Sequence, residues 1–182
     1  MLIHVEKAAD ILPEYLGTPI EPLLRFHNLR DPVSVPRGRA ELLVGMCMDN
    51  RKDLALPADF AFVIRAAGGN LRDHEFDISY AVAIGGLRAI ALLGHTQCGM
   101  VNLPERRELF IEGLVAHGGW TADHASAQFD ASVGVYAIED SVTFVLEESR
   151  RLSALYPKVL VAPLLYRVED DRLVQITRDH VS

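Results

Sequence analysis

The stretch of sequence that decides the fold is residues 88 to 99, Arg-Ala-Ile-Ala-Leu-Leu-Gly-His-Thr-Gln-Cys-Gly. Residues 88–94 form an apolar run of strand length with little polar alternation, which is typical of a strand covered on both faces. The runs 41–47 and 60–65 have the same character. Because strands covered on both faces occur mainly in parallel sheets, the three runs predict a parallel sheet at the centre of the molecule.

Helical patterns and further strand patterns surround these runs. Apolar residues recur near helical spacing in three segments, which we expect to be helices: 73–85, 104–117 and 135–155. The first of them joins two runs into a β-α-β unit. Residues 158–168 and 172–176 predict strands that return beside each other, and Pro163 suggests that the former is an edge strand or contains a bulge. The expected fold class is α/β, with a central, mostly parallel sheet flanked by helices and an antiparallel C-terminal strand.

Length and proline content indicate how the chain is organised. The 182 residues are enough for one ordinary domain and few for two. We therefore treat 1–182 as a single domain with an N-terminal helical arm at 1–38 and a variable insertion at 102–136. The arm is rich in proline and is expected to lie outside the core, where it would suit wrapping around a partner.

Charge and hydropathy argue against two classes of partner. The formal net charge is −7, whereas nucleic-acid binding depends on an excess of basic side chains. No apolar run approaches the roughly 20 residues that span a bilayer. The first residues also lack the basic-then-apolar order of a signal peptide. We therefore expect a cytoplasmic protein that binds neither nucleic acid nor membrane.

Residues that can bind a metal or a small substrate follow the predicted strands. Cys47 ends the first run, Gly68 and Gly69 follow the second, and His95 and Cys98 follow the third. The carboxyl ends of parallel strands face one crevice in an open α/β sheet, so these residues can converge. Two thiolates and an imidazole suit zinc, and three protein ligands leave a fourth position free for catalysis. Buried structural thiols and a strand-end histidine are the alternative interpretation.

Asp49 and Arg51 form a second candidate unit close to Cys47. Because they are two residues apart, an extended strand end places their side chains on one face. The guanidinium would keep the carboxylate ionised and oriented, able to accept a proton or to compete for the metal. An ordinary surface ion pair is the alternative.

Taken together, these motifs resemble the β-class carbonic anhydrases, including their short prokaryotic type. The resemblance runs from about Leu42 to Val101 and is carried by Cys47-x-Asp49-x-Arg51, Arg65-x-Ala67-Gly68-Gly69 and Gly94-His95-Thr96-x-Cys98-Gly99. It implies one zinc ion per chain, bound by Cys47, His95 and Cys98. It also implies an Asp49–Arg51 dyad, in which Asp49 becomes the fourth ligand in a closed state, and a homodimer or a multiple of dimers.

The resemblance implies reversible hydration of carbon dioxide to bicarbonate by attack of zinc-bound hydroxide. Two thiolates offset the charge of the ion, so its water should be less acidic than in a three-histidine site and activity should rise toward alkaline pH. Hydrolysis of carbonyl sulfide or carbon disulfide at the same zinc is an alternative, since relatives of this fold catalyse it and Ala66 departs from the family's usual asparagine. A non-catalytic zinc-binding module for assembly or sensing is an alternative of another class.

Several other residues have weaker patterns. Gly68 and Gly69 lack side chains, so their amides could approach a small substrate closely, although a plain strand-to-helix turn explains them as well. Residues 117–120, His-Gly-Gly-Trp, are expected to form a loop or lid near the crevice. Whether His117 or His124 reaches the site stays open. Three apolar residues of the segment 73–85 are expected in the core: Phe76, Tyr80 and Val82.

Overall fold

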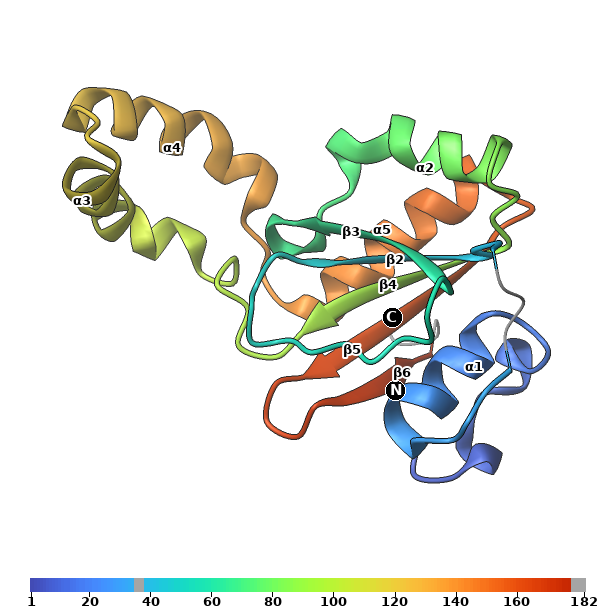
Figure 1. The fold of residues 1–182 in the computed structure, drawn as a ribbon. Coiled ribbons are helices and arrows are strands. Elements are labelled where there is room, and N and C mark those ends of the chain that lie inside the picture. Colours follow the sequence, from blue (N-terminus) through green and yellow to red (C-terminus); the bar gives the residue numbers. More distant parts are fainter. Residues whose placement is uncertain (35–37, 178–182) are drawn as a thin grey trace.

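The computed structural model describes residues 1–34 and 38–177, and within them six strands form one mixed sheet (Figure 1). The strands are β1 (Leu2–His4), β2 (Leu42–Cys47), β3 (Ala61–Ala66), β4 (Ala89–His95), β5 (Leu160–Arg167) and β6 (Arg172–Ile176). Their order is β1-β6-β5-β4-β2-β3. β3, β2, β4 and β5 are mutually parallel, whereas β6 runs antiparallel to β5 and β1 runs antiparallel to β6. The mostly parallel sheet with an antiparallel C-terminal strand confirms the predicted fold class.

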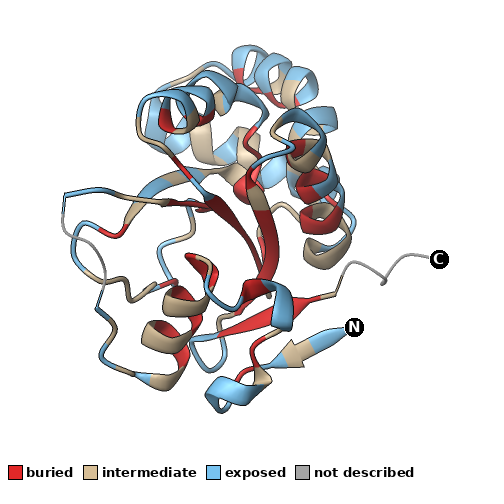
Figure 2. Ribbon diagram, turned by 90° about the vertical axis from the view of Figure 1, so that its right-hand side faces the viewer, coloured by how far each residue is buried: buried red, intermediate tan, exposed pale blue. Residues whose placement is uncertain are grey.

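The strands at the centre of the sheet are covered on both faces. Every residue of β2 and of β4 is buried, and Figure 2 shows the buried residues concentrated on the central strands. Successive strand residues point to opposite faces, so a strand buried on both sides has no polar positions to alternate with. This explains the continuous apolar runs in the sequence.

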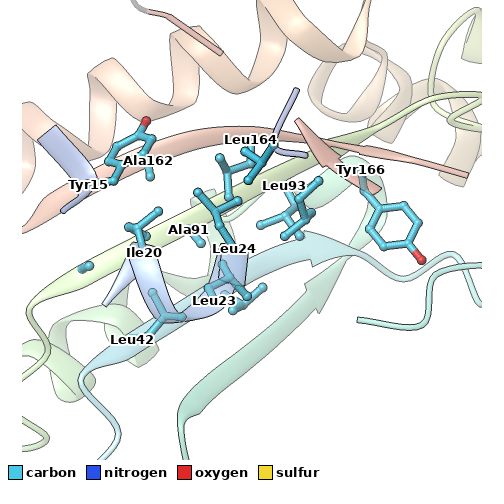
Figure 3. Packing of buried hydrophobic residues seen from close by; sticks show 14 of the residues in the cluster. Tyr15, Ile20, Leu23, Leu24, Leu42, Ala91, Leu93, Ala162, Leu164 and Tyr166 are labelled. Carbon is cyan, nitrogen blue, oxygen red and sulfur yellow. The ribbon is translucent and has the colours of Figure 1, made fainter. Parts of the chain in front are cut away.

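Two sets of helices cover the two faces. On one face, Ile20, Leu23 and Leu24 of α1 (Ile20–Leu24) join a core with strand residues such as Leu42 and Leu93 (Figure 3). On the other face the cover comes from α2 (Glu75–Ala83) and α5 (Ser141–Leu155). The second core includes these residues of the sheet and the two helices: Leu43, Ile90, Leu92, Ile78, Val145 and Leu152.

The N-terminal segment packs on its own sheet, so the expectation that it lies outside the core is wrong. Two 3₁₀ turns, Ala8–Asp10 and Pro13–Tyr15, precede α1, and a π-helical turn, η3 (Arg25–Leu29), follows it. Ile20, Leu23 and Leu24 are fully buried. Without this segment one face of the sheet would be exposed, so its apolar residues are needed by its own chain. Residues 35–37 of the predicted arm lie outside the described residues.

Pro163 lies on an interior strand, contrary to the expectation of an edge or a bulge. Leu160 N–H donates to the Arg88 carbonyl (3.1 Å) and Thr96 N–H donates to the Tyr166 carbonyl (3.0 Å), so these residues of β5 face β4. Pro163 is three residues from each and faces β6 instead. The pairing of β5 with β6 begins only at Leu164, so the missing proline N–H removes no ladder bond.

The segment predicted as a variable insertion is mostly a helical hairpin. η6 (Leu103–Arg106) and α3 (Arg107–Gly118) agree with the helix predicted at 104–117. α4 (Ala122–Tyr136) returns against α3, and the pair projects away from the sheet (Figure 1). The single helix predicted at 135–155 is wrong, because Asp140 accepts hydrogen bonds from Val142 N–H (2.8 Å) and Thr143 N–H (2.9 Å) and so begins α5 as a separate helix.

The core prediction for α2 is wrong for two of its three residues. Phe76 and Tyr80 are 80% and 59% exposed, whereas Val82 is half-buried and packs against the second core. The helix buries its other face, through Ile78 and Ala81. None of the helices in the described chain combines the length and the apolar character that crossing a bilayer requires.

Candidate metal centre

The structure brings the three predicted metal ligands together at the carboxyl edge of the sheet. Cys47 is the last residue of β2 and His95 is the last residue of β4, its parallel neighbour. Cys98 follows in a turn where Gln97 adopts a left-handed backbone conformation (φ 57°). The ligand atoms of the three residues all lie within 4.8 Å of one another, and all three residues are buried.

The hydrogen bonding of His95 fits a metal ion at this cluster. Its Nδ1 lies 2.9 Å from the Thr96 carbonyl oxygen. A carbonyl oxygen can only accept, so Nδ1 carries the hydrogen and Nε2 keeps a free lone pair. Nε2 is buried and has no hydrogen-bond partner among the described residues. A buried imidazole whose other nitrogen is fixed by a carbonyl is the usual arrangement of a metal-ligating histidine, and a Cys-His-Cys set suits zinc.

A hydrogen bond between the two cysteines shifts their pKa values in opposite directions. The pKa of Cys47 is lowered, above all because the Cys98 thiol hydrogen-bonds to it, although burial opposes this. The pKa of Cys98 is raised by the same hydrogen bond to Cys47 and by burial. Metal binding requires both sulfurs as thiolates, so a divalent cation would take the place of this proton.

The amino end of α5 packs against the end of β4 that carries His95. Ser141 Oγ donates a hydrogen bond of 2.7 Å to the His95 carbonyl oxygen. At Gly94 a Cβ atom would lie 2.8 Å from the Ser141 carbonyl oxygen, so only glycine allows α5 to approach β4 this closely. Ile138 and Phe144 pack against the two cysteines and help to enclose the cluster in apolar surface.

Asp49 and Arg51 form an ion pair beside the cluster, as their spacing predicts. Arg51 Nη2 donates to Asp49 Oδ2 at 2.7 Å and Arg51 Nε donates to both carboxylate oxygens, at 3.1 and 3.2 Å. The Arg51 backbone N–H also donates to Asp49 Oδ1, at 2.9 Å. Hydrogen bonds from Arg51 hold the pKa of Asp49 well below its ordinary value. The carboxylate is therefore ionised at any pH near neutrality.

Lys52 is a buried residue of this region that the sequence analysis missed. It is 3% exposed, and its ammonium donates to the Asp49 carbonyl oxygen at 3.0 Å. Arg65 donates to the same oxygen at 3.3 Å. Burial lowers the pKa of Lys52, whereas attraction to Cys47 and Asp49 opposes that effect. The only sequence signal is a further cation directly after Arg51, which does not reveal burial.

Gly68 and Gly69 form a tight turn next to the cluster. They lie in η4 (Ala67–Gly69), with φ of 66° and 78°, which favours glycine at both positions. A Cβ atom at Gly69 would lie 3.4 Å from the Leu93 carbonyl oxygen and 3.6 Å from the Cys47 nitrogen. These contacts are of ordinary van der Waals length, so the positive φ angles of the turn, rather than crowding, explain both glycines.

His117 and His124 flank the turn of the helical hairpin, so the predicted segment forms a turn but not a loop or lid near the crevice. Gly119 ends α3 in a left-handed conformation and Thr121 caps α4. Trp120 stacks on His124, with ring centroids 4.0 Å apart. This turn lies at the end of the hairpin that is farthest from the sheet (Figure 1), and the metal-ligand cluster contains neither histidine.

Comparisons with known proteins identify the fold. No protein-family model matches the sequence, and no curated protein has significant sequence similarity to it. Among solved structures, a carbonic anhydrase from Glaciozyma antarctica is 22% identical, with a TM-score of 0.62 over 92% of this chain and 100% of the other. The β-carbonic anhydrase isoform I from Trichomonas vaginalis is 16% identical, with a TM-score of 0.64 over 83% of this chain and 90% of the other.

A hydrolase has a similar fold. Carbon disulfide hydrolase is 21% identical, with a TM-score of 0.55 over 93% of each chain. Solved structures of this similarity are mostly β-carbonic anhydrases, and the mostly parallel sheet with its antiparallel C-terminal strand agrees with the predicted fold class. The chain therefore has the fold of the β-carbonic anhydrases, the family that its three motifs resemble.

Proposed function

We propose that this protein is a zinc enzyme that reversibly hydrates carbon dioxide to bicarbonate, with one zinc ion per chain. The observation that carries the proposal is the buried Cys47-His95-Cys98 cluster, in which the lone pair of His95 Nε2 has no partner in the part of the chain that the structure describes. The adjacent Asp49–Arg51 ion pair supports a catalytic role, because a purely structural zinc needs no oriented carboxylate beside it.

Each residue of the site has a distinct role in this proposal. Cys47, His95 and Cys98 hold the zinc ion, which when bound supplies the acidity that makes a water molecule nucleophilic. Asp49 is ionised and can accept a hydrogen bond or a proton from that water. Arg51 holds the carboxylate by several hydrogen bonds and keeps it from becoming a fourth ligand. Gly68 and Gly69 are proposed to let the substrate approach their backbone.

Hydrolysis of carbonyl sulfide or carbon disulfide is the second candidate. It is supported by the similarity of the whole chain to carbon disulfide hydrolase, whose structure covers 93% of this chain. Both substrates are linear and would be attacked at carbon by the same activated water. The apolar surface that Ile138 and Phe144 place around the cysteines suits either class.

Metal analysis and rate measurements on one preparation test the proposal. We expect about one zinc per chain and hydration of carbon dioxide that accelerates from about pH 7 to about pH 9. His95→Ala should lose both zinc and activity, whereas His124→Ala, at the exposed turn of the hairpin, should keep both.

Faster turnover of a sulfur substrate than of carbon dioxide would establish the second candidate instead. Bound zinc with no turnover of any of the three would indicate a non-catalytic module, and protein without zinc would overturn the proposal.

We also propose that the protein forms a homodimer through the face made by β3 and α2. β3 is an edge strand, paired only with β2 among the described residues. Phe62 and Val63 of β3 and Phe76 and Tyr80 of α2 are exposed, and a groove of about 250 Å³ lies between the two elements. Such a contiguous apolar patch is unusual on a monomer.

Light scattering tests the dimer. Phe76→Glu together with Tyr80→Glu should halve the measured mass, because two charges would be buried without partners at the interface. Leu109→Glu is the control, since Leu109 is equally exposed but lies on α3. A monomeric wild-type protein, or a double variant that keeps the dimeric mass, would contradict the proposal.

A further inference from the structure

Arg51 has a second set of hydrogen bonds besides those to Asp49. Its Nη1 donates to Gln97 Oε1 at 3.1 Å, and its Nη2 donates to the Gln97 carbonyl oxygen at 2.9 Å. A guanidinium presents five N–H donors in one plane. Asp49 and Gln97 therefore hold the Arg51 side chain from two sides and fix its orientation, although it is 44% exposed.

The orientation of the Gln97 amide is determined by a residue on another element. Gln97 Nε2 donates to Glu169 Oε1 at 3.0 Å. The carboxylate can only accept, so it selects the amide orientation in which Oε1 faces Arg51. In the reversed orientation the NH₂ group of Gln97 would face the guanidinium, and two donors would oppose each other.

Glu169 is itself fixed in the turn between β5 and β6. Its Oε2 accepts a hydrogen bond from Thr96 Oγ1 at 2.8 Å, and Thr96 Oγ1 accepts one from the Val168 N–H at 2.9 Å. Hydrogen bonds from its own backbone N–H and from Thr96 lower the pKa of Glu169, so the carboxylate is charged near neutral pH. The chain of contacts thus runs from the β5–β6 turn through Gln97 to Arg51.

We propose that Glu169 is a positioning residue that orients Gln97, which in turn holds Arg51 against Asp49 and so keeps the open metal position free of the Asp49 carboxylate. This inference rests on the proposed zinc site and on the exchange of Asp49 between Arg51 and the metal. Glu169 touches neither the substrate nor the metal, and its effect is on the balance between an open and a closed site.

The test uses protein reconstituted with cobalt(II), whose visible absorption reports the fourth ligand, and thiocyanate as an anion that competes for the open position. Arg51→Ala should give the spectrum of the closed site and weak thiocyanate binding. Glu169→Ala should shift the spectrum in the same direction and weaken thiocyanate binding about three- to tenfold, the range expected for losing a charge-assisted hydrogen bond at a solvent-exposed site. Gln97→Ala should have a similar effect, and the double variant should show little more than either single one.

The matched control is Asp170→Ala, on the same turn, because Asp170 pairs with Arg167 at 3.3 Å and makes no hydrogen bond with Gln97 in the described structure. It should bind thiocyanate like the wild type. The inference is overturned if Glu169→Ala binds thiocyanate like the wild type while Arg51→Ala does not, or if Asp170→Ala weakens binding as much as Glu169→Ala. A wild-type chain that takes up neither zinc nor cobalt would instead overturn the proposed function, so the two failures are distinguishable.

Discussion

Lys52 has a buried ammonium group, and burying that charge does not by itself stabilise the fold. No carboxylate side chain of the described residues lies within ion-pair distance of it, and its hydrogen bond goes to the Asp49 carbonyl oxygen. A buried cation normally needs a negative partner. The negative groups that attract it are Cys47 and Asp49, so the structure suggests that Lys52 is kept for the electrostatics of the site.

We therefore predict that Lys52→Met does not destabilise the metal-free protein. Methionine preserves most of the side-chain volume and removes the desolvated charge, so the free energy of unfolding should stay constant or rise by about 1 kcal/mol. Urea unfolding of the metal-free protein measures this. The exposed Lys158→Met serves as the control and should change stability by less than about 0.5 kcal/mol. A loss of more than about 2 kcal/mol in Lys52→Met would mean that the ammonium is structural.

The strand-end positions of the site residues, together with the resemblance of the three motifs, predicted the cluster and the ion pair but not the residues that support them. Cys47, Asp49 and Arg51 lie at the end of one strand, and His95 and Cys98 lie at the end of its neighbour, so the predicted topology alone brings them together. Lys52 was missed because nothing in the local pattern shows that it is buried. Glu169 was missed because it is 73 residues from Thr96, its partner, and looks like part of an acidic turn.

Among the elements, the π-helical turn η3 connects the N-terminal segment to the sheet by side-chain hydrogen bonds. Asn28 is 4% exposed, and its amide lies against Leu173 of β6. Asn28 Oδ1 accepts from the Leu173 N–H at 2.9 Å, and Asn28 Nδ2 donates to the Leu173 carbonyl oxygen at 2.7 Å. The side chain thus continues the ladder of β6 where β1 no longer pairs with it.

We predict that Asn28→Ala lowers the free energy of unfolding by about 2–4 kcal/mol, because two buried backbone groups of Leu173 lose their partners. Urea unfolding with a constant m-value is the measurement. Asn50→Ala changes an exposed asparagine and should have an effect below about 0.5 kcal/mol. An Asn28→Ala protein as stable as the wild type would show that water replaces the side chain at no cost.

The errors at the element scale have a common physical cause. Periodicity shows which face of a helix is apolar but not what covers that face, so Phe76 and Tyr80 were assigned to the core although they are exposed. Proline in the first residues masked the helical pattern of α1, whose partners are strands far along the chain. The break between α4 and α5 depends on the cap at Asp140, a local signal that the long apolar pattern obscured.

For the molecule as a whole, a single buried histidine links the N-terminal segment to the loop that carries the ion pair. His27 of η3 is 1% exposed, and its Nδ1 accepts a hydrogen bond from the Ala55 N–H at 3.1 Å. Nδ1 is therefore unprotonated, and Nε2, which must carry the hydrogen, has no partner among the described residues. Burial lowers the pKa of His27, and the charges of Arg30 and Arg172 add to this effect while Asp171 opposes it.

This environment makes global stability depend on pH in a known direction. In the unfolded chain His27 has its ordinary pKa of about 6.5, so below that pH the unfolded state binds a proton that the folded state does not. The free energy of unfolding should fall as the pH drops from about 6.5 toward the lower folded pKa, by up to about 1.4 kcal/mol per pH unit. His27→Gln keeps an acceptor for the Ala55 N–H without a titrating group. Between pH 7.5 and pH 5.5 the wild type should therefore lose more stability than the variant. If the variant is the less stable protein at pH 7.5, the difference between the two should shrink at pH 5.5.

Urea unfolding of both proteins at equal zinc concentration measures this difference, because the pH dependence of zinc binding is common to the two. Stability curves that stay parallel across this range would show that His27 does not cause the pH dependence.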